Sequence, residues 1–148
     1  MKVGFNDSEN YWIGNDRLNT LTSTGNPKLR IDMWKNEVHH TSEYSTFSVG
    51  NESTGYALHQ GGYSGTAGDC LYYNEGMQFS TYDRGTSMGC AQRSNGSWWY
   101  DSCTYAGMNN KIGHSDAFTW HCSASIFGTG YDNSYSLSLT QMWLLVFE

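Results

Sequence analysis

The sequence lacks the features that mark membrane proteins and nucleic-acid-binding proteins. Its longest apolar run covers residues 142–147, whereas a transmembrane helix needs about 20 apolar residues. The first ten residues contain no apolar stretch typical of a signal peptide. Only 8 lysines and arginines stand against 14 aspartates and glutamates, for a formal net charge of −6. Scattered cations at this density provide no basic patch for nucleic acid or for an anionic membrane.

Aliphatic side chains are also scarce. The 148 residues include 9 leucines, 4 isoleucines and 4 valines. Aromatic residues replace them, with 6 tryptophans, 11 tyrosines and 6 phenylalanines, and each of these can bury about 150–250 Å². The rest of the chain is rich in glycine, serine, threonine and asparagine. This composition predicts one loop-rich extracellular domain with an aromatic core, and it excludes a helical bundle.

The four cysteines show no C-x-x-C spacing, which argues against a zinc ribbon or a thioredoxin motif. An even number of cysteines in a short chain of this composition predicts two disulfides and an oxidising compartment. Three N-x-[ST] sequons agree with a secreted glycoprotein. Their asparagines are Asn6, Asn51 and Asn95.

The apolar pattern predicts a short helical part followed by strands. Residues 8–22 can form helical turns, with Ser8 and Asn15 as caps. Apolar and polar residues alternate in four segments, as in half-buried strands. These segments are residues 29–33, 38–49, 56–59 and 135–147. Residues 61–130 show little periodicity, so this region is expected to consist of loops held by disulfides and a bound ion or ligand.

Several ordered motifs give the sequence a family resemblance. They are GYSGTAGD at residues 62–69, GMQFSTYDR at 76–84, CA at 90–91 and GSWWYDSC at 96–103. YWIGND at 11–16, LRIDMW at 29–34 and YSLSLTQM at 135–142 fit the same order. The chain therefore resembles a fibrinogen-related domain over nearly its whole length.

The resemblance implies an α+β fold of the fibrinogen C-terminal type. Such a fold has a small antiparallel sheet, short helices and a loop-rich, disulfide-stapled ligand-binding subdomain. Domains of this family are longer at the N-terminal end, so residues 1–148 are expected to form a single, N-terminally shortened fibrinogen-like domain, which is either a short form or a fragment. By the same resemblance Cys90 pairs with Cys103. Cys70 and Cys122 then remain and are expected to pair by elimination, the alternative being a free or intermolecular thiol.

Many members of the family bind calcium in the loop after F-S-T-x-D, through two aspartates and main-chain carbonyls. Here Asp83 matches the first aspartate, but Gly85 replaces the second, and the loop to Cys90 is short. Calcium prefers six to eight oxygen ligands. No cofactor is therefore expected, and Asp83 is interpreted as a turn residue.

The ligand pocket of the family lies beside the second cysteine of the W-W-Y-x-x-C motif. In many members the peptide bond before this cysteine is cis, which would be the Ser102–Cys103 bond here. The N–H groups of Cys103 and Thr104 would then donate to the oxygen of an acetamido group. The ligand-binding residues implied by the resemblance are Ser102, Cys103, Thr104, Tyr105, His114 and Trp120.

Other residues near these motifs have two readings. Trp98 and Trp99 are expected to pack in the core. Tyr105 and Tyr131 are candidates for stacking on a sugar. Arg93 or Lys111 could pair with a ligand carboxylate, or could equally be a solvated surface charge. The histidines on strand-like segments, which are His39, His40 and His59, are expected to be surface or packing residues.

These features predict a secreted, carbohydrate-binding lectin that recognises N-acetylated sugars, with sialic acid foremost. The resemblance extends to the short sialic-acid-binding lectins of molluscs and to ficolin- and tachylectin-type lectins of innate immunity. The alternative is a structural, adhesion or coagulation-type interaction module of the same family. A homo-oligomer is expected, because a single small lectin site typically needs multivalency to reach useful avidity.

Catalysis is not expected. A hydrolase could draw on Asp101, His114 or Asp116. However, the sequence contains neither a nucleophile elbow nor a paired-carboxylate motif. The expected partners are therefore sialoglycoconjugates and other glycans with N-acetyl groups, and not nucleic acid or a membrane.

Overall fold

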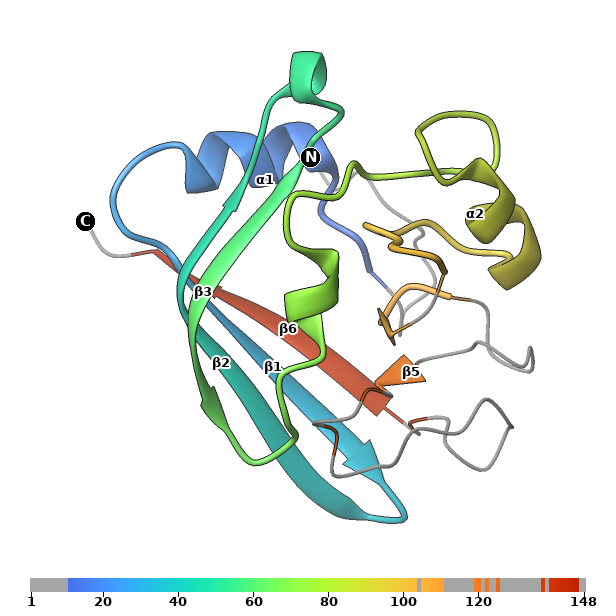
Figure 1. Cartoon of the computed structure of the whole chain (residues 1–148). Coiled ribbons are helices and arrows are strands. Elements are labelled where there is room, and N and C mark those ends of the chain that lie inside the picture. Colours follow the sequence, from blue (N-terminus) through green and yellow to red (C-terminus); the bar gives the residue numbers. More distant parts are fainter. Residues whose placement is uncertain are drawn as a thin grey trace.

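The computed structural model of the protein describes residues 11–103, 105–110, 119, 120, 122, 125, 137 and 139–146. Its main element is a four-stranded antiparallel sheet with the strand order β3-β2-β1-β6. The strands are β1 (Lys28–Lys35), β2 (Val38–Val49), β3 (Leu58–Gly65) and β6 (Leu139–Leu145). The last strand of the chain therefore lies beside the first (Figure 1). This arrangement confirms the predicted α+β fold with a small antiparallel sheet.

The other elements are short. They are α1 (Asn15–Thr22), η1 (Glu52–Thr54), η2 (Leu71–Asn74), α2 (Met88–Ser94), β4 (Ala106–Gly107) and β5 (Thr119–Trp120). α1 packs against β2, where the Asn19 side-chain amide donates to the Val49 carbonyl at 2.9 Å. In Figure 1 the sheet forms one side of the molecule, and α2 with the segment after it lies on the other. No helix among the described residues is long and apolar enough to cross a membrane.

Aromatic side chains supply much of the core, as the composition predicts. Leu29, Ile31 and Met33 are buried on the inner face of β1. Trp98 and Trp99 are fully buried between this sheet and the loops, and their rings meet edge to face at 5.0 Å. These indoles bury the apolar area that the few aliphatic residues cannot supply.

One carboxylate on the outer face of the sheet is almost fully buried. Asp32 accepts hydrogen bonds from Arg30, at 2.9 Å, and from His39, at 2.7 Å. Burial acts to raise the pKa of Asp32, but the bonds from Arg30, His39 and Trp143 outweigh it and lower this pKa below its ordinary value. Asp32 is therefore ionised and forms a structural ion pair with Arg30.

The predicted helix and strands need five corrections. Residues 11–14, predicted as part of the helical turns, form no helix, and the predicted strand at 135–147 is β6, which covers Leu139–Leu145. α1 begins at Asn15, and Gly14 stands at the N-cap without a side-chain bond, so the prediction that Asn15 caps the helix is wrong. The predicted strand at 29–33 runs from Lys28 to Lys35. The predicted strand at 56–59 is shifted, because β3 covers Leu58–Gly65 and includes part of the supposed loop region. Ser8 lies outside the described residues.

The glycines of β3 explain why the alternation of apolar and polar residues does not predict this strand. Gly62 adopts a positive φ of 67°, and a Cβ at this position would collide with the Ser45 side chain on β2. Two strands that approach this closely need a residue without a side chain at that point. The same residue removes the apolar–polar alternation from which a strand is predicted.

Candidate ligand-binding site

A tightly bonded segment between β3 and η2 forms the base of the site. The N–H groups of Thr66 and Ala67 both donate to the Thr41 carbonyl, at 2.8 and 3.0 Å. The Gly68 N–H donates to the Tyr63 hydroxyl at 2.8 Å, and the Gly68 carbonyl accepts from the Trp120 indole at 3.0 Å. This segment thus joins the sheet to the far loops through main-chain bonds.

Asp69 continues this network. Its carboxylate accepts from the Tyr44 hydroxyl at 2.8 Å and from the Tyr72 N–H at 3.2 Å, at the start of η2. Burial, followed by the negative charge of Asp69, raises the pKa of Tyr44 far above its ordinary value. Tyr44 therefore remains a neutral phenol that donates to Asp69.

Two disulfides cross-link the loops. Cys70 pairs with Cys122, with a Cα–Cα distance of 5.6 Å, and Cys90 pairs with Cys103, with a Cα–Cα distance of 4.9 Å. Both predicted pairings are confirmed. Because Cys90 belongs to α2, the second disulfide fixes the Cys103 segment to this helix.

The residues before Cys103 are held in the core. Trp98 forms an antiparallel bridge with Ser80, and the Trp99 indole donates to the Tyr56 carbonyl at 2.7 Å. The Tyr100 hydroxyl lies 2.6 Å from the Asn110 side-chain oxygen. The prediction that Trp98 and Trp99 are core residues is confirmed. This buried run, residues 98–100, fixes the position of the residues that follow it.

The backbone turns sharply at Ser102 and Cys103. Both residues adopt positive φ angles, of 45° and 88°. The expectation of a cis bond between them is wrong, because the described residues contain no cis peptide bond. Two consecutive residues at positive φ change the chain direction here instead. Such conformations are costly outside glycine and cluster at functional sites. We call Ser102 and Cys103 the Cys103 turn.

A tyrosine cluster borders the Cys103 turn. Tyr105 stacks on Tyr73 with ring centroids 4.3 Å apart and planes inclined by 19°. Tyr72 meets Tyr73 edge to face at 5.7 Å and is 65% exposed. Sequence analysis identified Tyr105 but missed Tyr72 and Tyr73. Their only signal was their position directly after the family motif that ends at Asp69.

Four of the six predicted ligand residues fall within the described part of the chain. Ser102 is exposed, and Cys103 and Tyr105, one and three residues further along the chain, are half-buried. Trp120 is different, because its side chain is 0% exposed and supports Gly68 from below. The remaining two, Thr104 and His114, lie outside the described residues, and so do the further candidates Lys111 and Tyr131. Asp116 lies outside them as well.

The loop at Asp83 has a shape that excludes a second carboxylate. Asp83 accepts a hydrogen bond from the Thr81 hydroxyl at 2.7 Å, as a turn residue does. Gly85 adopts a φ of 106°, and a Cβ there would lie only 2.7 Å from the Ser80 Cα. An aspartate therefore cannot replace Gly85 without moving the backbone. Within the described ranges, no three histidine, cysteine, aspartate or glutamate side chains gather to hold a metal ion.

Two of the three sequon asparagines are described, and both are exposed. Asn51 precedes η1, and its side-chain oxygen accepts from the Ser53 hydroxyl at 2.6 Å. Asn95 ends α2 in the left-handed conformation, at a φ of 47°. Both positions leave room for a glycan. Asn6 lies outside the described residues.

Comparison with known proteins identifies the family of this domain. The sequence model of the fibrinogen beta and gamma chains, C-terminal globular domain, matches residues 1–145. The chain belongs to this family. As a fibrinogen-like domain it is a binding module and not an enzyme.

The relatives include extracellular proteins of several kinds. Tenascin-R of Gallus gallus is 39% identical over 127 residues, which cover 81% of this chain and 9% of that protein. Fibrinogen-like protein A of Apostichopus parvimensis is 40% identical over 119 residues, which cover 74% of this chain and 42% of that protein. The chain thus spans less than half the length of these curated relatives.

Solved structures of the family superpose well on this chain. The fibrinogen-like globe domain of human ANGPTL6 is 28% identical with a TM-score of 0.78, and the match covers 99% of this chain and 69% of that one. Lamprey fibrin D-dimer, complexed with the peptide Gly-His-Arg-Pro-amide, is 26% identical with a TM-score of 0.72. That match covers 92% of this chain and 50% of the fibrin chain.

Proposed function

We propose that the protein is a secreted lectin that binds N-acetylated sugars at the Cys103 turn, with sialic acid as the foremost ligand. The observation that carries this proposal is the turn itself. Two adjacent non-glycine residues are held at positive φ by a disulfide and by the buried run before them. Successive main-chain N–H groups in such turns form concavities that bind oxygen atoms. The Cys103 N–H would donate to the acetamido oxygen.

The tyrosine cluster supports a sugar as the ligand. Tyr73 and Tyr105 form a stacked pair beside the turn, and Tyr72 adds an exposed ring. Aromatic faces of this kind suit the apolar face of a pyranose. Thr104 and His114 complete the proposed contacts, and Trp120 holds the base of the site from within the core.

The carboxylate of sialic acid needs a cation. Arg93 lies on α2 three residues after Cys90, and residues at this spacing share a helix face. Because Cys90 is bonded to Cys103, we assign Arg93 to this carboxylate. Arginine binds carboxylates through two parallel hydrogen bonds, so lysine should not fully replace it.

Calorimetry with the methyl glycoside of N-acetylneuraminic acid tests the proposal. The de-N-acetylated sugar should bind at least about tenfold more weakly, since that ratio corresponds to about 1.4 kcal/mol. Tyr105→Ala should also weaken binding. Tyr82→Ala is the matched control, because Tyr82 is 70% exposed and is not part of the tyrosine cluster. Equal affinity for the two sugars would refute the proposal.

Peptide binding is the second candidate function, and the lamprey fibrin complex favours it. That relative holds Gly-His-Arg-Pro-amide, a cationic peptide that requires a carboxylate partner. Asp101 directly precedes the Cys103 turn. Titration with this peptide separates the two functions. The peptide-binding function would be established if the wild type bound this peptide but no glycan, and if Asp101→Asn abolished the peptide binding.

We also propose that the protein forms a homo-oligomer. The outward side chains of β6 include Leu139, Trp143 and Leu145, and all three are exposed to about half of their surface. β6 carries no charged residue, and charges are the usual protection of an edge strand. Light scattering should give a multiple of 16.7 kDa, and Trp143→Glu should reduce the mass. A monomeric mass at high concentration would contradict the proposal.

A further inference from the structure

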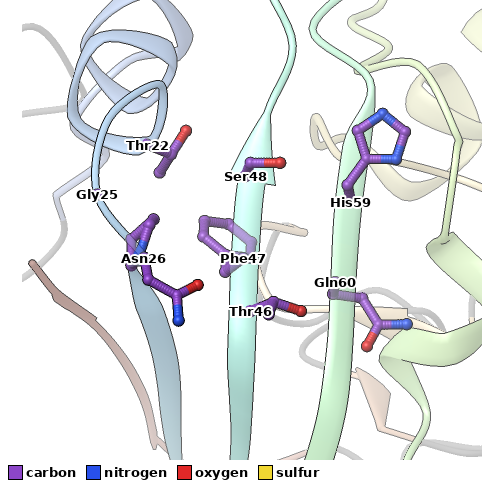
Figure 2. Close-up of a pocket in the computed structure, with 9 residues that line it drawn as sticks. Thr22, Gly25, Asn26, Thr46, Phe47, Ser48, His59 and Gln60 are labelled. Atoms are coloured by element: carbon purple, nitrogen blue, oxygen red, sulfur yellow. The ribbon is translucent and has the colours of Figure 1, made fainter.

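A second cleft lies on the sheet and shares no residue with the Cys103 turn. Figure 2 shows this cleft, which has a volume of about 310 Å³. The loop after α1 forms one wall, and β2 and β3 form the rest. The residues that line it include Asn26, Thr46, Phe47, Ser48, His59 and Gln60.

The frame of this cleft is rigid. β2 and β3 pair in an antiparallel register that places Ser48 opposite His59 and Phe47 opposite Gln60. The loop is tied to β2 by a hydrogen bond from the Phe47 N–H to the Pro27 carbonyl at 3.1 Å. Phe47 itself is 3% exposed, and its side chain packs in the core on the face of β2 opposite to the Thr46 and Ser48 side chains. The side chains around the cleft are therefore held by secondary structure.

The polar side chains of this cleft are uncommitted. Among the described residues, the hydroxyls of Thr46 and Ser48 make no hydrogen bond to the protein, and neither do the side-chain amides of Asn26 and Gln60. Figure 2 shows these four groups on the three segments that surround the cleft. Together they offer hydroxyl and amide donors and acceptors to a ligand.

His59 is oriented by a neighbouring carboxylate. Its Nδ1 atom lies 2.9 Å from one oxygen of Glu75, and the other oxygen accepts from the Gln60 N–H at 2.7 Å. A carboxylate on Nδ1 selects the tautomer in which Nδ1 carries the proton, and Nε2 then becomes an acceptor for a hydroxyl. Glu75 therefore positions His59 for a ligand that donates O–H groups.

We propose that this cleft is a second binding site, which takes a neutral sugar residue. The lining carries no lysine, arginine, aspartate or glutamate side chain, and Glu75 behind His59 disfavours an anion. Hydroxyls, amides and one imidazole can donate to and accept from the hydroxyl groups of a pyranose. The site goes beyond the proposed lectin function, since its ligand needs neither an acetamido group nor a carboxylate.

Amide chemical shifts of the ¹⁵N-labelled protein test this site. The probes are methyl β-galactopyranoside, methyl α-glucopyranoside and methyl α-mannopyranoside. At least one should cause saturable shifts at residues 46–48 and 59–60. The double variant Thr46→Val/Ser48→Ala, which keeps the shape of the strand, should weaken this binding by about tenfold. Ser64→Ala, a serine on β3 outside the cleft, should leave it within about twofold.

A measurement on the same sample separates the two sites. N-acetylneuraminic acid should still shift the amides of the Cys103 turn in the double variant, provided that the thermal midpoint is unchanged. The second site would be supported if the double variant lost the saturable shifts in the cleft and kept those at the Cys103 turn. The absence of saturable shifts with all three probes would overturn it, as would shifts that the double variant leaves unaltered. Neither result depends on whether sialic acid binds.

Discussion

Replacement of Trp120 by alanine tests whether this residue belongs to the core or to the ligand pocket. The family resemblance places Trp120 at the pocket, where its loss would weaken binding without unfolding the chain. In the structure the side chain is 0% exposed, and its indole N–H donates to the Gly68 carbonyl at 3.0 Å. We therefore expect Trp120→Ala to act mainly on stability.

The expected loss is large. Truncation of a buried tryptophan to alanine costs about 3–5 kcal/mol, including the cavity that remains. For a domain of this size, each 1 kcal/mol lowers the melting temperature by about 2–4 °C. Trp120→Ala should therefore lower the midpoint by roughly 6–20 °C. Trp120→Phe, which keeps the ring but loses the donor to Gly68, should fall between this variant and the wild type.

Urea unfolding followed by far-ultraviolet circular dichroism measures the effect, with Tyr82→Ala as the control. Tyr82 is exposed, so its loss should change the free energy of unfolding by no more than about 0.5 kcal/mol. If Trp120→Ala were as stable as this control and still lost sugar binding, the indole would be a pocket wall, and our placement of Trp120 in the core would be wrong.

Three further predictions concern the disulfides, acid stability and calcium. Loss of the Cys70–Cys122 bond, which spans 52 residues, should cost about 4 kcal/mol in urea unfolding, against about 3 kcal/mol for the Cys90–Cys103 bond, which spans 13. Only the second loss should abolish sugar binding, because it releases the Cys103 turn; the reverse order would contradict this assignment. The lowered pKa of Asp32 means that its ionised form stabilises the fold at neutral pH. As the pH falls below about 4, the ordinary value for a free aspartate, and then through the lowered pKa of Asp32, the wild type should lose stability relative to Asp32→Asn; parallel pH profiles of the two proteins would show that the ion pair contributes nothing. Glycan binding should persist in EDTA, and binding restored by calcium alone would show that the loop at Asp83 holds an ion.

The strands of the sheet differ in how far the sequence predicts them. β1 and β2 have one buried and one exposed face, so apolar and polar residues alternate along them. β3 contains Gly61, Gly62 and Gly65, and its positions are set by close approach to β2 and not by burial. No periodicity remains, and the apolar–polar pattern therefore predicts a loop at the family motif in β3.

The disulfides beside the candidate site could be predicted, but the backbone geometry there could not. The resemblance predicted the Cys90–Cys103 disulfide correctly, and elimination predicted the Cys70–Cys122 disulfide correctly. It could not give the positive φ angles at Ser102 and Cys103, because neither residue type requires that conformation. It also missed the contact between Tyr73 and Tyr105. These residues are far apart in the sequence, and only the packing of η2 near β4 brings their rings together.

The strained Cys103 turn depends on the core that precedes it. Two residues at positive φ cost of order 1–3 kcal/mol each, and they persist only where neighbouring structure overdetermines them. Trp98, Trp99 and Tyr100 are fully buried immediately before the turn, and the Cys90 disulfide closes it on the other side. The aromatic residues that compensate for the scarcity of aliphatic ones thus also fix the main-chain donors of the site. Under the function that we propose, substitutions at exposed residues such as Tyr72 and Arg93 would change ligand specificity without removing the buried residues that hold the turn.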